Sequence, residues 1–259
     1  MPELPEVETY KRYFDSTSLN QVIDDVEIID DRILLASKEN FIKCLIGGKF
    51  EETIRHGKYL LAKVGNCNII FHFGMSGWLE YFSSEESIPK YSKVIFRFDN
   101  GDSLAYISIR MFGKLDLADS LETFRKKKIL GPDAYKMSFD EFQSAISRRT
   151  AILKSALLNQ SIISGIGNIY SDEILFKAKI HPKRKINTLN ENELEMLFKS
   201  IKEVLDYGIK HEGELDTYSN SFLIPHRSKD GFCPDCGGII ERYEISGRHG
   251  FFCPKCQPL

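Results

Sequence analysis

Residues 233–256, CPDCGGIIERYEISGRHGFFCPKC, contain two Cys-x-x-Cys pairs that are separated by sixteen residues. Four thiolates at this spacing are typical of a tetrahedral zinc site. Such a site stabilises a segment that is too short to form its own hydrophobic core. Two disulfides or an iron–sulfur cluster are the alternative interpretations. We predict one structural Zn2+, because four thiolate ligands leave no position open for water. The predicted ligands are Cys233, Cys236, Cys253 and Cys256.

The residues between the two cysteine pairs form two strand-like runs around Gly247 and Gly250. This pattern predicts a β-hairpin with Arg248 near its tip, where the hairpin would hold the guanidinium outward. An ordinary solvated turn arginine is the alternative. The other two cysteines, Cys44 and Cys67, lie in apolar or strand-like surroundings, and we expect them to be reduced core thiols.

The composition is that of a globular protein, with 42% hydrophobic and 28% charged residues in a chain of 259. No apolar run approaches the ~20 residues of a membrane span, and no signal stretch is evident, so we expect a cytosolic protein. The net charge is −2, but residues 145–185 hold eight Lys/Arg against two acids. A basic stretch in a neutral chain favours a surface that contacts phosphate. A solvated helical surface is the alternative.

The pattern of elements changes along the chain and predicts an α+β fold. Residues from about 20 to 118 contain short β-branched and aromatic runs, which are typical of a sandwich or barrel. Asn100-Gly101 between two of these runs predicts a type I′ hairpin turn. Helical patterns follow over residues 138–146, 151–158, 169–178 and 191–210, and Asn190 with Glu193 predicts a capping box for the last of them.

The amino-terminal stretch MPELPEVETY predicts a short helix that begins near Pro5, with acids in its first turn. Removal of Met1 would leave Pro2 with a free secondary amine. An α-amino group has a pKa of about 7.7–8.0, so its neutral form can attack an electrophilic carbon and form an imine. Glu3 would then hold or move a proton. An ordinary capped helix is the alternative.

Two further segments are candidates for phosphate binding. In SIISGIGNIYSDE (residues 161–173), Gly165 and Gly167 predict a tight turn into a helix, whose free N–H groups would bind a phosphate together with the Asn168 amide. A simple turn is the alternative. In RHGKYLLAK, Lys58 follows a glycine at the start of a strand; taken alone, it is an ordinary surface lysine.

Five motifs in this order resemble the formamidopyrimidine-DNA glycosylase family, which also contains endonuclease VIII. The resemblance spans nearly the whole chain, and its first and third motifs favour the formamidopyrimidine branch. The motifs are PELPEVE (2–8), HGKYL (56–60), FHFGMSG (71–77), GIGNIY-x-DE (165–173) and CPxC…GR…FFCPxCQ (233–257).

The resemblance implies a two-domain enzyme of base-excision repair that binds damaged double-stranded DNA and flips the damaged nucleotide out of the stack. It implies removal of oxidised or ring-opened bases through an imine between Pro2 and the sugar C1′, followed by β,δ-elimination. We expect a monomer in the cytoplasm, associated with the nucleoid when it is bound to DNA. The expected parts are a catalytic β-sandwich with an N-terminal helix (1–125), a linker (126–137), a helix–two-turn–helix domain (138–228) and a zinc finger (229–259).

The resemblance also implies roles for individual residues. Lys58, Asn168 and Arg248 would grip phosphates, while Met75, Arg110 and Phe112 would fill the gap and probe the opposite base. Without the resemblance, core packing is the alternative for Met75 and Phe112. The implied catalytic residues are Pro2, Glu3, Lys58 and Arg248, with Glu6 in support; the implied DNA-binding residues are His72, Met75, Arg110, Phe112, Lys154, Asn168 and Arg248.

The chain departs from the family pattern at two places. Ser108 and Ile109 stand where Asp-Pro usually precedes the probing arginine, and Met111 replaces a second basic residue. The segment from His211 to Phe232 is short for a loop that covers a flipped oxidised purine. Two other hypotheses follow: a non-catalytic DNA-binding member that recognises damage or structure, and a zinc-ribbon adaptor, which explains the last thirty residues alone.

Overall fold

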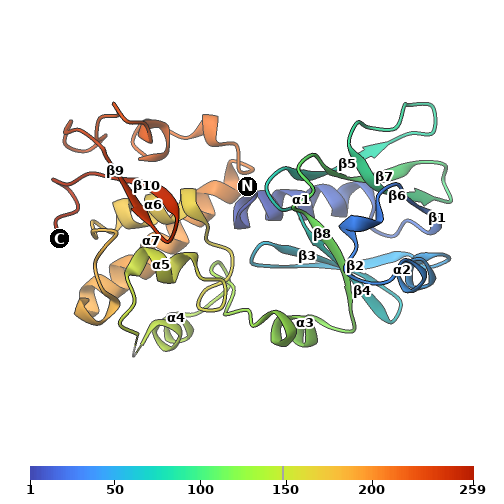
Figure 1. Cartoon of the computed structure of the whole chain (residues 1–259), viewed down its shortest axis with the longest axis horizontal. Helices are drawn as coiled ribbons and strands as arrows, with labels where there is room; N and C mark the ends of the chain where they lie inside the picture. The colour runs from blue at the N-terminus through green and yellow to red at the C-terminus, as the bar shows by residue number, and fades with distance from the viewer. Residues whose placement is uncertain (148) are drawn as a thin grey trace. The chain divides into compact units, whose positions relative to one another are not determined.

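The structure is a computed structural model that describes residues 1–147 and 149–259, and it divides into two compact units (Figure 1). The first unit contains residues 1–2 and 7–128, and the second contains residues 3–6 and 129–259. The helical and zinc-finger segments predicted from the sequence therefore belong to one compact unit. The first helix, α1 (Leu4–Thr17), contributes its first turn to the second unit and its remainder to the first.

The first unit is a β-sandwich of two four-stranded antiparallel sheets, which confirms the predicted architecture. One sheet has the order β1-β6-β7-β5 and the other β2-β3-β4-β8. The strands are β1 (Ile23–Ile28), β2 (Phe50–His56), β3 (Tyr59–Val64), β4 (Cys67–His72), β5 (Gly77–Phe82), β6 (Ser92–Phe98), β7 (Ser103–Ser108) and β8 (Lys114–Ala118).

Aromatic side chains from both sheets form the core of the sandwich. The ring of Phe96 in one sheet lies 5.8 Å from that of Phe50 and 6.0 Å from that of Phe71 in the other sheet. Phe14 of α1 packs edge-on against Phe50 at 4.8 Å. Alternating side chains of each strand reach this core, which is why the short aromatic runs were recognisable in the sequence.

Several local features of the first unit differ from the sequence prediction. Strands β2 and β8 and the helices α2 (Lys38–Leu45) and α3 (Leu121–Lys128) were not among the predicted elements. The two helices have only eight residues each and bury few apolar side chains, so their periodic signal is weak. The turn after β6 is a hairpin as predicted, but only Gly101 has a positive φ (91°). It is therefore not a type I′ turn, which needs positive φ at both central residues.

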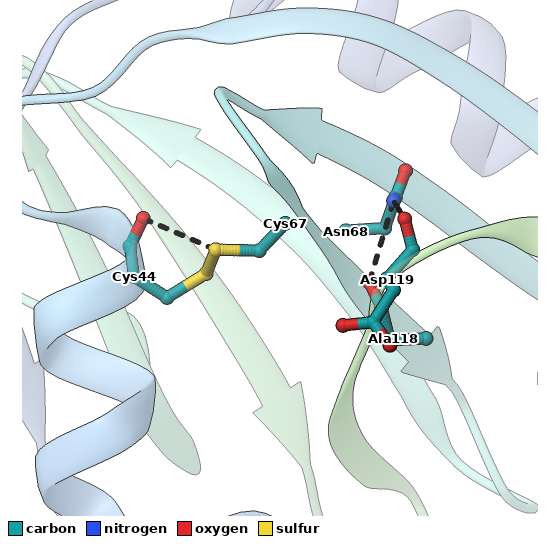
Figure 2. Close-up of a disulfide and its surroundings, with 5 residues drawn as sticks. All are labelled: Cys44, Cys67, Asn68, Ala118 and Asp119. Atoms are coloured by element: carbon teal, nitrogen blue, oxygen red, sulfur yellow. Dashed lines mark hydrogen bonds between the residues drawn. A yellow bond between two sulfur atoms is a disulfide. The ribbon is translucent and has the colours of Figure 1, made fainter.

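The prediction that Cys44 and Cys67 are reduced thiols is wrong. A disulfide joins them and links the last turn of α2 to the start of β4 (Figure 2). The two residues are 23 positions apart, and their Cα atoms are separated by 6.4 Å. The local sequence around each cysteine is that of a core thiol. Only the fold brings the two cysteines close enough to form a disulfide.

The second unit contains the four predicted helices and the predicted hairpin. The hairpin strands pair antiparallel, with Arg248 opposite Ile245. Strand β10 of the hairpin contacts α6. The elements are α4 (Phe139–Ile146), α5 (Leu153–Leu158), α6 (Asn168–Lys177), α7 (Glu191–Lys210), β9 (Glu241–Ile245), β10 (Arg248–Phe252) and the 3-10 turns η2 (Ile186–Thr188), η3 (Leu215–Thr217) and η4 (Ile224–His226).

Helix α6 lies at the centre of the second unit. Residues 170–176 are all buried, and α7 packs against this helix with Leu197, Ile201 and Val204 in the core. A helix that is buried on every side has no solvent-exposed face for its polar residues. The acids at Asp172 and Glu173 therefore need partners within the protein.

The predicted capping box of α7 is confirmed and carries a stability prediction. The Asn190 side chain accepts a hydrogen bond from Glu193 N, and the Glu193 carboxylate accepts one from Asn190 N. We expect Asn190→Ala to lower the free energy of unfolding by about 1 kcal/mol, since the Glu193 N–H loses its side-chain acceptor. Urea unfolding measures the change, with Glu195→Ala, at an exposed position inside the same helix, as the control. Equal stability of the two variants would contradict this account.

Candidate active site and zinc centre

The Glu3 carboxylate lies at the first turn of α6. The side chain is almost completely buried, with 2% exposure. One carboxylate oxygen accepts a hydrogen bond from Ile169 N at 3.0 Å, and the other accepts one from Tyr170 N at 3.4 Å. The prediction that these helix N–H groups are free to bind phosphate is wrong, because the chain supplies its own anion to the positive end of the helix.

The glycines of the GIG motif allow this close approach. A Cβ atom added to Gly167 would lie 2.2 Å from the Glu3 side chain, and one added to Gly165 would lie 2.5 Å from Leu4. Gly165 also has a φ of 115°, which L side chains rarely adopt. The motif therefore forms the surface on which the amino-terminal turn packs.

Glu6 supports the Glu3 backbone. Its carboxylate accepts a hydrogen bond from Glu3 N at 2.7 Å and another from the Tyr170 hydroxyl at 2.9 Å. Burial, followed by the nearby Glu3 charge, raises the pKa of Glu6 to about 7. Near neutral pH, Glu6 can therefore take up or release a proton at the carboxyl group that accepts a hydrogen bond from the N–H of the Pro2–Glu3 peptide.

Pro2 directly precedes this hydrogen-bonded turn. It is partly buried, whereas Met1 before it is 48% exposed. Removal of Met1 would convert the Pro2 nitrogen into a secondary amine that is fixed by its neighbour Glu3. A neutral amine and a carboxylate in adjacent residues are the groups that covalent catalysis with proton transfer requires.

The hairpin and the start of α6 place Arg248 and Asn168 in one part of the second unit. Arg248 is exposed and follows the turn residues Ser246 (φ 54°) and Gly247 (φ 69°), as the hairpin prediction required. The Asn168 amide donates a hydrogen bond to the carbonyl of His249, at 2.8 Å. The structure thus brings together two of the predicted phosphate-binding side chains.

Lys154 is buried and does not present its ammonium group to solvent. Its Nζ donates to the Asn168 carbonyl at 2.9 Å and forms an ion pair with Asp172 at 2.5 Å. Burial lowers the pKa of Lys154, although the Asp172 charge opposes this effect. The resemblance implied a DNA contact for Lys154, but this ammonium is directed into the protein.

In the first unit, Lys58 directly precedes β3, and His72 is the last residue of the neighbouring strand β4. Lys58 occupies the turn between β2 and β3 and is 7% exposed. Tyr59, the residue after it, packs against the His72 ring with the ring centres 4.9 Å apart and the ring planes tilted by 37°. Burial, followed by the charges of Lys58 and Lys128, lowers the pKa of His72 to about 4. His72 is therefore neutral near pH 7 and offers a hydrogen bond rather than a positive charge.

Met75, Arg110 and Phe112 are exposed on two loops that touch one another. Met75 is 43% and Phe112 is 55% exposed, so the core-packing alternative is wrong for both. The Arg110 guanidinium lies 5.3 Å from the centre of the Phe112 ring. Gly74 (φ 60°) lets the loops meet, since a Cβ there would lie 2.3 Å from Gly113 N. Exposed apolar side chains beside a cation are suitable for insertion into an opened base stack.

The four cysteines of the two Cys-x-x-Cys pairs converge on one point. Their sulfur atoms all lie within 4.8 Å of one another, and the sulfurs of Cys233 and Cys256 are 3.7 Å apart. Those of Cys236 and Cys253 are 3.5 Å apart. A tetrahedron with Zn–S bonds of about 2.3 Å has sulfur atoms about 3.8 Å apart, so the four thiolates fit one structural zinc.

Family models match almost the whole chain. The formamidopyrimidine-DNA glycosylase N-terminal domain matches residues 1–115, and its H2TH domain matches residues 130–219. The zinc finger found in FPG and IleRS matches residues 231–259. The chain belongs to the formamidopyrimidine-DNA glycosylase family.

Curated glycosylases of this family align over their full length. The formamidopyrimidine-DNA glycosylase of Listeria monocytogenes is 31% identical and covers 99% of this chain and 100% of its own. That of Streptococcus pneumoniae is 34% identical, with 99% of each chain covered. The Listeria alignment spans 274 positions, whereas this glycosylase has 259 residues. At least 15 aligned positions, 274 minus 259, are therefore gaps in this chain.

Solved structures of the family have the same fold. The Lactococcus lactis Fpg, in a complex with abasic-site DNA, superimposes with a TM-score of 0.89 at 30% identity and covers 99% of this chain and 100% of its own. MutM in complex with DNA containing carbocyclic 8-oxo-G gives a TM-score of 0.89 at 30% identity, with both chains fully covered. Among the described residues of this glycosylase, no helix is both long and apolar enough to span a bilayer.

Several residues that organise the site were not singled out from the sequence. Tyr170 contacts Glu6, and its hydroxyl also accepts a hydrogen bond from the hydroxyl of Tyr218 at 3.2 Å. Asp172 pairs with Lys154, and Glu173 accepts hydrogen bonds from two backbone N–H groups of the segment after α7. The available signal was the pair of adjacent acids inside an otherwise apolar helix, since such acids are buried only with partners.

Loss of one zinc ligand should abolish DNA binding. We expect Cys253→Ser to lose the metal and unfold the finger, so that the hairpin no longer presents Arg248. Zinc content and binding to a duplex with an abasic-site analogue measure both effects. Cys67→Ser, which removes a cysteine outside the cluster, should keep the zinc. Full binding after complete zinc removal would overturn this prediction.

The raised pKa of Glu6 predicts a pH-dependent stability. A carboxyl group whose pKa rises from 4.5 to about 7 on folding stabilises the protein below pH 4.5. This contribution is lost as the pH rises through 7, because the folded protein disfavours the ionised form. We expect the wild type to lose roughly 1–3 kcal/mol relative to Glu6→Gln across this range. Urea unfolding at several pH values tests this, with the exposed Glu85→Gln as the charge control. A pH-independent difference would contradict the assignment.

Proposed function

We propose that this DNA glycosylase of base-excision repair uses the secondary amine of Pro2 as its nucleophile and also cleaves the DNA strand as a lyase. The observation that carries the proposal is the fixed amino-terminal turn. Glu3 is held by the start of α6 and Glu6 is held by Glu3 N and Tyr170. A protein that only binds DNA has no need for a buried carboxylate beside a terminal secondary amine.

The proposed reaction follows from these groups. The neutral Pro2 nitrogen forms a bond to the sugar C1′ as the bond from C1′ to the damaged base breaks. Opening of the sugar ring, with a proton on its ring oxygen, gives a cationic imine. That imine acidifies the neighbouring C–H bond, so elimination of the 3′ and then the 5′ phosphate nicks the strand. Glu3 is the proton-transfer group, and Glu6 fixes its backbone.

The DNA-binding roles are proposed for polar and exposed apolar side chains on each unit. The second unit supplies Arg248 and Asn168 for phosphate binding. The first unit supplies Lys58 for phosphate and the exposed wedge of Met75, Arg110 and Phe112 for the opened base stack. The Lactococcus lactis Fpg is bound to abasic-site DNA in its solved complex, which supports damaged DNA as the partner. We further propose that the enzyme acts as a monomer in the cytoplasm, at the nucleoid.

The segment after α7 supports a proposal about the preferred lesion. Tyr218, Phe222 and Leu223 are buried in the second unit, and Glu173 holds the N–H groups of Leu223 and Ile224 at 3.1 and 2.8 Å. A segment packed in this way has little chain left to fold over a flipped base.

Blocking the amino terminus tests the nucleophile. We expect a protein with additional residues before Pro2 to give no borohydride-stable adduct with abasic-site DNA, because its amine is converted into an amide. Pro2→Gly should retain weak trapping, since it keeps a terminal amine. The mass of each intact protein confirms whether Met1 is removed. A stable adduct from the blocked protein would show that a lysine is the nucleophile. Absence of trapping in the wild type, with DNA binding retained, would support a non-catalytic member of the family.

Lesion preference tests the role of the contracted segment. We expect abasic sites and formamidopyrimidines to be cleaved faster than 8-oxoguanine opposite cytosine, by about tenfold or ~1.4 kcal/mol of barrier. Abasic sites and formamidopyrimidines depend less on a loop that covers the flipped nucleotide, since removing them from the base stack costs less free energy. Single-turnover cleavage of matched duplexes that differ only in the lesion measures this ratio. Equal or faster cleavage at 8-oxoguanine would show that the segment after α7 does not set the lesion preference. The choice between lesions would then be made around Glu3 and Glu6.

A further inference from the structure

Asp172, in the middle of α6, is a carboxylate that accepts hydrogen bonds from four other segments of the second unit. Its side chain has no exposed surface. One oxygen accepts from Lys154 Nζ at 2.5 Å and from the Tyr243 hydroxyl at 2.6 Å. The other accepts from Arg227 Nη2 at 2.7 Å and from Phe251 N at 3.1 Å. Helix α5, the segment after η4 and both hairpin strands thus meet at one side chain.

The charges around Asp172 require a carboxylate at this position. The Lys154 side chain is 1% exposed and that of Arg227 is 13% exposed, so two cations share one buried anion. Removing the negative charge would leave both cations without compensation, which costs far more than the loss of an ordinary hydrogen bond. An amide of the same size cannot replace this function.

The hairpin packs against Asp172 along both of its strands. Tyr243 lies opposite Gly250 in the hairpin register. A Cβ atom added to Gly250 would lie 2.7 Å from the Asp172 carboxylate and 2.5 Å from the Tyr243 ring. Only a residue without a side chain therefore lets the hairpin reach α6 here, and Arg248 stands two residues before it.

Asp172 is also connected to Asn168. Lys154, its ion-pair partner, donates a second hydrogen bond to the Asn168 carbonyl. The Asn168 amide in turn holds the carbonyl of His249, the residue after Arg248. Two routes through hydrogen bonds, one along the hairpin and one through Lys154, therefore run from the Asp172 carboxylate to the two phosphate-binding side chains.

We propose that Asp172 is a positioning residue that fixes Arg248 against Asn168, so that the two side chains bind the DNA backbone together. Asp172 does not contact DNA itself, and Lys154 belongs to the same positioning group. This inference rests on the proposed function, which assigns Arg248 and Asn168 to phosphate. In this proposal the zinc folds the finger, whereas Asp172 sets the position of the hairpin for DNA binding. The two effects are separable, because the groups that donate hydrogen bonds to Asp172 are not zinc ligands.

A double-mutant cycle tests the proposal. The readout is the affinity of the full-length protein for a duplex with a tetrahydrofuran abasic-site analogue, measured by fluorescence anisotropy at fixed salt. Arg248→Ala should weaken binding about tenfold in the wild type, as expected for the loss of one charged hydrogen bond. In the Asp172→Asn background, the same change should cost less than about twofold, since Arg248 is no longer in place. Zinc content should stay at one per chain.

Two further variants keep the cycle decisive. Glu173→Gln alters the adjacent buried acid, which holds the N–H groups of Leu223 and Ile224 rather than the hairpin, so Arg248→Ala should keep its tenfold effect there. Tyr243→Phe removes one donor to Asp172 and remains informative if Asp172→Asn does not fold; the effect of Arg248→Ala should then fall to about threefold. An undiminished tenfold effect in the Asp172 and Tyr243 backgrounds would overturn the inference. No effect of Arg248→Ala in the wild type would instead remove the phosphate role of Arg248, and with it the basis of the inference.

Discussion

The contact between the Glu3 carboxylate and the start of α6 is the interaction on which the site depends. A carboxylate that is 2% exposed is stable only when its charge is compensated. The N–H groups of Ile169 and Tyr170 supply that compensation, and an anion at a helix start contributes up to about 2 kcal/mol in a partly buried position. The contact fixes residues 3–6 within the second unit. Pro2 is therefore bonded directly to Glu3, a residue whose position is fixed by the start of α6.

Helix α6 links the proposed nucleophile to the proposed DNA contacts. Its first turn holds Glu3, Tyr170 contacts Glu6, and the acids that follow hold the hairpin and the segment after α7. Because the helix is buried on every side, none of these groups can relax into solvent when a partner is lost. A change at one of them should therefore affect a specific part of the site rather than the stability of the unit alone.

Features that depend on neighbouring residues in the sequence were predictable. The four zinc ligands, the hairpin with Arg248 and the Asn190 cap each lie within one short pattern, and the structure confirms them. Glu3 at α6 was not predictable, since 166 positions separate Glu3 from Ile169. Asp172 and Tyr243 are 71 positions apart, and the disulfide of the first unit also joins two segments that are distant in sequence. Lys154 was assigned to DNA through the resemblance, and its buried partner Asp172 is placed beside it only by the fold.

The central claim is that the amino-terminal turn exists to present the Pro2 amine. Peptide mapping of the borohydride-reduced complex with abasic-site DNA tests this most directly, because it locates the covalent bond. After digestion of the protein by trypsin and of the DNA by nuclease, the account predicts the sugar remnant on the peptide of residues 2–11, with the fragment ions placing it at Pro2. A remnant on the peptide that contains Lys58, or on any other lysine, would contradict it.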